Sequence, residues 1–131
     1  MWRTVASIVC GLVACAAVAT ILNFGLRAAL PGYHAAEATL LFTSAMKAGR
    51  LIEAAIASFV AGLVVRAIAP TSHAAPWITG AIILAMFLPV HVQLWSRFPV
   101  WYHLTFLLSI VPLIVLGASI GAARLRQIRP A

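Results

Sequence analysis

Four long apolar runs constrain this chain more than any other feature of its sequence. They cover about residues 4–26, 48–68, 77–95 and 101–122 of the 131 residues, and they are continuous and rich in Ala and Leu. A helix needs about 20 apolar residues to cross a hydrocarbon core of ~30 Å, and lipid offers its backbone no other hydrogen-bond partner. The runs lack the alternation of barrel strands. The sequence therefore predicts an all-α integral membrane bundle of four transmembrane helices with up-down topology, in a single membrane domain over residues 1–131.

The composition excludes the main soluble classes. Hydrophobic residues make up 64% of the chain and charged residues 8%, and Glu37 and Glu53 are the only acids. A soluble domain needs far more polar surface, and a disordered chain needs low hydrophobicity. The net charge is +7, but the basic residues are spread singly, so we expect no nucleic-acid partner. The expected environment is the lipid bilayer.

The connections between the runs contain residues that end helices. Leu30-Pro31-Gly32 ends the first run and Pro70 the second, since Pro and Gly do not continue a helix cheaply. The turn at residues 96–99 is so short that the third and fourth runs must be antiparallel neighbours. The apolar stretch at residues 38–46 is interpreted as an interfacial lead-in or as the outer turns of a tilted helix.

Lys and Arg near the ends of the runs set the orientation in a membrane. With four spans both termini share one side, and the compact basic group at the C-terminus predicts that this side is cytoplasmic, in the plasma (inner) membrane. Tyr33, Trp95, Trp101 and Tyr102 are predicted to mark the outer interface as an aromatic belt. The basic residues are Arg3, Arg66, Arg124, Arg126 and Arg129 on the terminal side, and Arg27, Lys47, Arg50 and Arg97 on the outer side.

Small residues and prolines predict how the helices pack. Gly62 ends a series of small residues at four-residue spacing in the second run, and Gly117 and Gly121 form a GxxxG pair in the fourth. Such residues let membrane helices approach closely, and the GxxxG pair suits either a seam within the chain or a homodimer face. Pro89 and Pro112 lie inside the third and fourth runs and should kink them, as a hinge or widened cavity or as static kinks that improve packing.

One group of polar residues lies inside or at the ends of these apolar runs, at nearly the same predicted depth. Counting inward from the outer interface at about 1.5 Å per residue places the group within a slab of ~10 Å, with at least one member on each helix. Glu53 is the only acid inside a run, so it should face the bundle and be ionised beside a partner. Arg50 on the same helix face is the nearest partner, with a histidine as the partner across helices. The cluster comprises Asn23, Arg27, Arg50, Glu53, His91 and His103.

Several interpretations of this cluster are open. Glu53, His91 and His103 form a ligand set for zinc or iron, and the two histidines alone could be axial ligands of haem. Arg27, Arg50 and Glu53 with a histidine could instead hold the polar head of a small ligand or pass a proton. In the structural interpretation Arg27 extends to head groups, Glu53 only pairs with Arg50, and the histidines bond to water or backbone. No metal-binding spacing is present, so no cofactor is expected, with haem or metal as the alternative.

The sequence predicts a non-enzymatic role. Asp is absent, no Gly-rich phosphate loop is present, and no two acids lie close in the chain. Transporters usually consist of repeated halves of several helices, and no repeat relates the first two runs to the last two. We expect a structural or accessory membrane subunit, as a homo-oligomer or within a larger complex. The first alternative is the handling of a small molecule, ion or proton through the polar cluster, and the second is haem or metal binding.

Two segments carry a resemblance to a group of membrane proteins. They are Phe-Leu-Pro-Val-His-Val-Gln-Leu-Trp at residues 87–95 and Phe-Pro-Val-Trp-Tyr-His-Leu at residues 98–104. With Gly-Leu-Val at residues 11–13, Arg27 and Leu30-Pro31-Gly32-Tyr33, the chain resembles small bacterial four-span integral membrane proteins of unknown function. The resemblance covers most of the chain. It implies four spans and a bacterial plasma membrane, and it brings no activity, cofactor or site residue.

Overall fold

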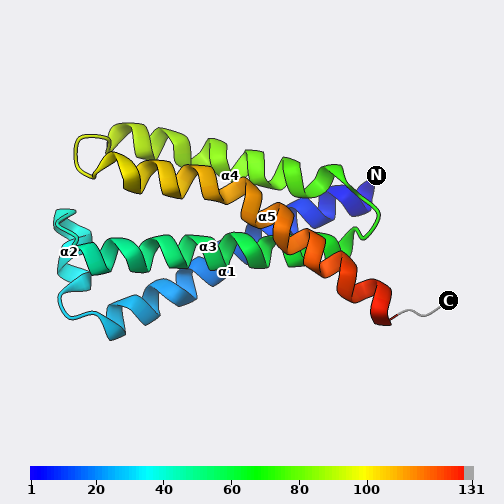
Figure 1. Cartoon of the computed structure of the whole chain (residues 1–131), viewed down its shortest axis with the longest axis horizontal. Helices are drawn as coiled ribbons and strands as arrows, with labels where there is room; N and C mark the ends of the chain where they lie inside the picture. The colour runs from blue at the N-terminus through cyan, green and yellow to red at the C-terminus, as the bar shows by residue number, and fades with distance from the viewer. Residues whose placement is uncertain (129–131) are drawn as a thin grey trace.

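Five helices make up the described part of the chain, residues 1–128 of a computed structural model (Figure 1). They are α1 (Trp2–Ala29), α2 (Tyr33–Thr39), α3 (Ser44–Ile68), α4 (Ala74–Gln93) and α5 (Val100–Ile128). No strand occurs within residues 1–128, and every helix except α2 is long and apolar enough to cross a membrane. The predicted all-α class with four long apolar helices is therefore confirmed. Arg129, which the orientation argument counted, lies outside the described residues.

The helices differ from the predicted spans at their ends. The second begins at Ser44 rather than 48 because Thr43 caps it, its hydroxyl oxygen accepting a hydrogen bond from the Met46 N–H at 3.3 Å. The first covers 2–29 instead of 4–26, the third 74–93 instead of 77–95, and the fourth 100–128 instead of 101–122. Hydropathy marks where apolar residues stop, whereas the helical hydrogen bonds of α5 continue through the basic residues that follow.

The stretch at residues 38–46 is broken rather than continuous with a span. α2 ends at Thr39, Leu40 has a left-handed backbone at φ 59°, and α3 begins at Ser44. A left-handed conformation costs a residue with a Cβ about 1–2 kcal/mol. Contact of Leu40 with the buried residues beside α2 compensates for this cost. As a result, α2 is a separate short helix at one end of the bundle (Figure 1).

α3 is the central helix of the bundle. It packs along both α5 and α1, and α4 packs on α5. A Cβ on Gly62 of α3 would overlap the carbonyl oxygen of Ile114, and a Cβ on Gly117 of α5 would overlap that of Phe59. Gly121 is looser, since the nearest atoms to its would-be Cβ belong to side chains at 3.4 Å or more. Close backbone approach between α3 and α5 therefore uses Gly117 within the chain, and Gly117 is not free for a homodimer face.

The two ends of the bundle carry different groups. In Figure 1 the N-terminus and the end of α5 lie at one end, called the terminal end here. α2 and the turn at residues 94–99 lie at the other, called the α2 end. An apolar core between the ends contains Ala61, Ile83, Phe106, Ile110 and Ile114. Pro89 and Pro112 lie within α4 and α5 with exposed side chains, and a hinge role for them stays a prediction.

Candidate functional site

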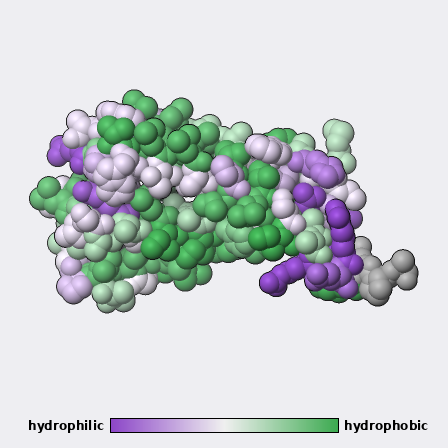
Figure 2. Space-filling model, in the orientation of Figure 1, coloured by the Kyte–Doolittle hydropathy of each residue, from purple (hydrophilic) through white to green (hydrophobic). Residues whose placement is uncertain are grey.

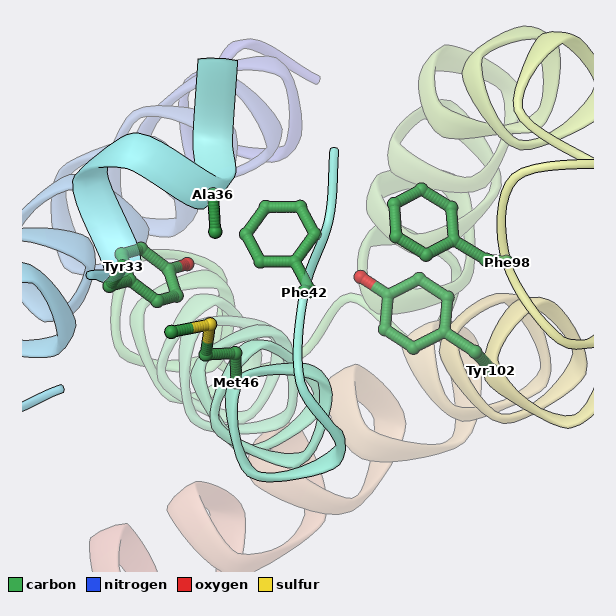
Figure 3. Packing of buried hydrophobic residues seen from close by; sticks show 6 residues of the cluster. All are labelled: Tyr33, Ala36, Phe42, Met46, Phe98 and Tyr102. Atoms are coloured by element: carbon green, nitrogen blue, oxygen red, sulfur yellow. The ribbon is translucent and has the colours of Figure 1, made fainter. Parts of the chain in front are cut away.

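An aromatic cluster closes the α2 end of the bundle (Figure 3). Its neighbouring rings are tilted relative to one another, with centroids 5.7 Å apart for Tyr33 and Phe42, 5.8 Å for Phe42 and Phe98, and 5.1 Å for Phe98 and Tyr102. α2 contributes to this cluster because Gly32, at φ 77°, turns the chain so that Tyr33 starts a helix directed over α3. The six buried members are Tyr33, Ala36, Phe42, Met46, Phe98 and Tyr102.

Tyr33 and Tyr102 are not the belt residues that the sequence predicted. Their side chains are 0% and 4% exposed, and both hydroxyls point into the bundle as partners of Arg50. The two tryptophans of the predicted belt, Trp95 and Trp101, are exposed by 44% and 50%. Burial of a tyrosine requires a hydrogen-bond partner for its hydroxyl, and Arg50 supplies one for each.

A hydrogen-bonded network joins α1 and α2 around Glu37. Its carboxylate accepts a hydrogen bond from Asn23 Nδ2 at 2.9 Å and one from Arg27 Nε at 2.8 Å, and His34 Nδ1 lies 3.4 Å away. Partial burial raises the pKa of Glu37, but the hydrogen bonds from Asn23, Arg27 and His34 lower it more, so its pKa lies below the ordinary value. Glu37 is therefore an ionised anchor that ties α2 to α1.

Arg50 extends this network to α5. Its Nη1 donates to the Tyr33 hydroxyl at 3.0 Å and its Nε to the Tyr102 hydroxyl at 3.2 Å, and the Tyr33 hydroxyl donates to Asn23 Oδ1 at 3.1 Å. The guanidinium also lies over the Phe42 ring at 5.0 Å. Burial raises the pKa of Tyr33 more than Arg50 lowers it, so its hydroxyl keeps the proton that it donates. The result is one chain of hydrogen bonds from Glu37 to Tyr102.

His91 and His103 form a second polar pair, next to this network. Their Nδ1 atoms are 2.8 Å apart, and the side chains are 6% and 0% exposed. One Nδ1 must carry a proton and the other a lone pair, so the pair holds one shared proton between the rings. His103 is stacked on Trp95 at 4.7 Å and 13°, and no partner within residues 1–128 contacts its buried Nε2. That nitrogen is an unused hydrogen-bonding position.

A cavity of about 290 Å³ lies between these two polar groups. It combines the Arg50 cation, the Glu37 carboxylate, two buried imidazoles and an aromatic wall, and its volume is just below the range for ligand pockets, roughly 300–1,000 Å³. Figure 2 shows paler and purple side chains at the α2 end against green along the middle of the bundle. The lining includes Arg50, His91 and His103, with Phe87, Phe98 and Phe106.

The structure assembles only part of the predicted cluster. Asn23, Arg27 and Arg50 join one network, and His91 and His103 bond to each other. Glu53 joins neither: within residues 1–128, no hydrogen bond or ion pair reaches its carboxylate. The expected pairing of Glu53 with Arg50 or a histidine is thus wrong, because the Arg50 side chain extends the other way, toward Tyr33 and Tyr102. Ionisation of Glu53 stays a prediction.

The metal and haem interpretations do not fit this geometry. Within residues 1–128, no three His, Cys, Asp or Glu side chains come together, so Glu53, His91 and His103 are not a ligand set. Axial haem ligands stand about 4 Å apart, twice the ~2 Å metal–nitrogen distance, on opposite faces of the iron. At 2.8 Å the two Nδ1 atoms of His91 and His103 bond to each other and leave no room between them for a haem iron. The three-ligand set is therefore not assembled in this arrangement, and haem or metal binding stays a prediction.

Three residues of the site were missed from the sequence. Glu37 lies outside the apolar runs, and Tyr33 and Tyr102 were assigned to an aromatic belt. The available signal was the pairing of a lone acid with the arginine ten residues before it, on either side of a Pro-Gly turn. Such a turn brings the flanking segments together, and a carboxylate at a membrane surface needs a cation.

Comparisons of the chain with protein-family models, with curated proteins and with solved structures find no match. The function is therefore argued from the site alone.

The Glu37 network predicts a loss of stability in acid. Because the folded-state pKa of Glu37 is below its ordinary value of about 4.3, the network contributes stability that is fully present above that value. This contribution is lost as the pH falls through the folded-state pKa. Glu37→Gln should cost about 1 kcal/mol at pH 7 and remove this part of the acid dependence, measured by unfolding in detergent from pH 7 to 3.

Glu53→Gln is the matched control for this measurement, since Glu53 has no part in the network. It should keep the acid-dependent loss that Glu37 causes. Equal acid sensitivity in the parent and in Glu37→Gln would contradict an ionised, bonded Glu37.

Proposed function

We propose that the four long helices cross a bacterial plasma membrane in alternate directions, with both termini in the cytoplasm. The support is their length and hydropathy, the common end at which Figure 1 places the N-terminus and the end of α5, and the arginines of the terminal end. On this placement the α2 end faces the outside. The site then lies within the outer half of the membrane, close to the head groups.

We further propose that the cavity at the α2 end binds a small amphiphilic anion. One observation carries this proposal: Arg50 is fixed by two tyrosine hydroxyls at the cavity, and within residues 1–128 no acidic side chain lies within 4 Å of it. The Glu37 carboxylate lines the same cavity, but its partners are Asn23 and Arg27, so Arg50 has no carboxylate bonded to it and can attract an anion.

Arg50 has hydrogen-bonding capacity left for such a ligand. A guanidinium carries five N–H donors, and the bonds to Tyr33 and Tyr102 use two of them, which leaves three. Carboxylate and phosphate oxygens are the groups that match a guanidinium best. The two tyrosines also restrict the side chain to one position, so binding costs little conformational entropy.

The other walls of the cavity specify the rest of the ligand. Phe87, Phe98 and Phe106 offer apolar and aromatic surface, and the histidine pair offers a hydrogen-bonding nitrogen at its edge. A molecule with one anionic head and a short apolar body uses all three features. The His103 Nε2 carries a proton when its Nδ1 accepts the hydrogen bond from His91 and a lone pair when its Nδ1 donates, so the tautomers of the pair decide whether it presents a donor or an acceptor.

Octanoate is a direct probe of this proposal. In a variant with Trp2→Phe, Trp77→Phe and Trp101→Phe, Trp95 is the only tryptophan left. Trp95 stacks on His103, so its fluorescence reports on the cavity. Octanoate should change this signal saturably in lipid nanodiscs. Octanol, with the same chain length and no charge, should give only the linear change of a molecule that partitions into lipid.

Arg50→Gln should weaken octanoate binding about tenfold or more, the loss of charge-assisted hydrogen bonds. Tyr102→Phe keeps the charge and removes one of the two supports of Arg50, so a smaller loss is expected. Arg97→Gln, an exposed change in the neighbouring turn, should leave binding unchanged. Identical curves for octanoate and octanol, or an undiminished response in Arg50→Gln, would reject the site.

The role of accessory or structural subunit, alone or as a homo-oligomer, stays a prediction, as does a non-enzymatic role. Ion and proton handling also stay predictions. The bonded histidine pair is the feature of the structure closest to proton handling. A proton taken up at the Nε2 of the ring that donates would let the shared proton pass between the two Nδ1 atoms and the other ring release its own Nε2 proton.

A further inference from the structure

A second cavity, at the terminal end of the bundle, has a different chemistry from the one described above. It measures about 640 Å³ and lies between the α3–α4 connection and the last turns of α5. Figure 2 shows purple, hydrophilic side chains over those last turns of α5. Its polar lining consists of Arg66, Thr71, His73, Ser119 and Arg126.

Arg66 is the distinctive member of this lining. Its side chain lies on α3 and is 8% exposed, and its two hydrogen bonds go from Nε to the Ala118 carbonyl at 3.2 Å and from Nη1 to the Pro70 carbonyl at 2.8 Å. Both acceptors are neutral. Within residues 1–128 no acidic side chain lies within 4 Å of Arg66, so a buried cation stands there without a counter-ion. Three of its five N–H donors remain for a ligand.

The whole terminal end is short of negative side chains. Both acids of the sequence, Glu37 and Glu53, lie on the half of the bundle that carries α2, whereas Arg3, Arg66, Arg124 and Arg126 lie toward the terminal end. The N-terminus of α4, which begins at Ala74, brings the positive end of a helix dipole to the cavity, and the C-terminal ends of α3 and α5 bring negative ends. Within residues 1–128 the charged side chains that line the cavity are Arg66 and Arg126, and both favour an anion.

We propose that this cavity binds a phosphate group. A tetrahedral oxyanion suits a cavity that offers a fixed guanidinium, a second arginine on a neighbouring helix and the hydroxyl donor of Thr71. Basic pockets between membrane helices at the cytoplasmic surface hold the head groups of anionic lipids. The phosphate then comes from a phospholipid head group or from free phosphate. The proposal assumes only that the helices cross a membrane, and it is independent of the octanoate site.

Native mass spectrometry of the intact protein tests this site. The detergent-solubilised chain is given equal amounts of phosphatidylglycerol and phosphatidylcholine. The expected result is about a tenfold preference for bound phosphatidylglycerol, which Arg66→Gln and Arg126→Gln each reduce toward equality. Arg126 is exposed, so its replacement does not threaten folding, and circular dichroism verifies the helix content of both variants.

Two controls separate this site from the other one. Arg97→Gln removes a basic residue at the α2 end, and Arg50→Gln removes the proposed octanoate cation; both should keep the lipid preference. Inorganic phosphate, titrated alone and followed by ³¹P NMR, identifies the source. If inorganic phosphate binds and its binding depends on Arg66, free phosphate is the source. If the protein prefers phosphatidylglycerol but does not bind inorganic phosphate, the lipid head group is the source. The proposal would be overturned if the parent retained both lipids equally and did not bind inorganic phosphate. It would also be overturned if the lipid preference survived the loss of both Arg66 and Arg126.

Discussion

Gly62→Ala is expected to lower the free energy of unfolding by about 3 kcal/mol, one of the largest effects of any single change in this bundle. A methyl group on Gly62 would overlap the carbonyl oxygen of Ile114, which belongs to the backbone of α5 and cannot turn aside. The two helices must separate, and the contacts of Ile110 and Ile114 in the core weaken with them. Unfolding in mixed detergent micelles, followed by circular dichroism, measures the loss.

Gly25→Ala is the matched control for this change. Gly25 also lies inside a long helix, but a Cβ there would meet no atom within 4 Å. Ala favours a helix over Gly by about 1 kcal/mol, so this variant should be as stable as the parent or slightly more so. If both variants lose the same free energy of unfolding, the close approach of α3 and α5 at Gly62 does not contribute to stability as argued.

The second large effect concerns the His91–His103 pair. His91→Leu leaves both ring nitrogens of His103 buried without a partner, and should cost about 2–3 kcal/mol. His103→Leu should cost a similar amount, because His91 then loses its Nδ1 partner. The double change to Leu removes both buried polar groups, so its cost should be smaller than the sum of the two single costs by at least ~1 kcal/mol.

The same double-mutant cycle separates a structural role from a ligand role. Stability is measured by unfolding in detergent, and binding by the octanoate response. A double variant that is nearly as stable as the parent but responds weakly to octanoate supports the ligand role. Additive losses of stability would show that the two imidazoles do not interact, and would contradict the bonded pair. His73→Leu, at the exposed start of α4, should change stability by less than about 0.5 kcal/mol.

The long helices could be predicted because apolar run length is a strong signal. The similar distance of His91 and His103 from the turn at residues 96–99 could also be predicted, since helical rise is constant and this turn is short. Their neighbouring positions were thus foreseeable, whereas the direct bond between the two rings was not. That bond depends on side-chain rotamers, which sequence spacing does not determine.

Glu53 shows where spacing misleads. Its three-residue separation from Arg50 places both on one helix face, but a helix face does not choose the partner of a long side chain. Arg50 reaches Tyr33 and Tyr102 instead, and Tyr33 is in position only because α2 packs across the end of the bundle. A seven-residue helix is too short to be stable alone and depends on such packing. Neither α2 nor the contacts of Arg50 with Tyr33 and Tyr102 could be predicted from local sequence.

The placement of the two ends of the bundle on opposite faces of a membrane is the claim on which both proposed sites depend. A reporter enzyme that is active only outside the cytoplasm tests it, fused in one version after Ser96 in the turn at the α2 end and in another at the C-terminus. With both termini in the cytoplasm, the Ser96 fusion should be active and the C-terminal fusion inactive. Activity at the C-terminus without activity at Ser96 would invert the orientation, and equal activity at both would contradict a four-span arrangement.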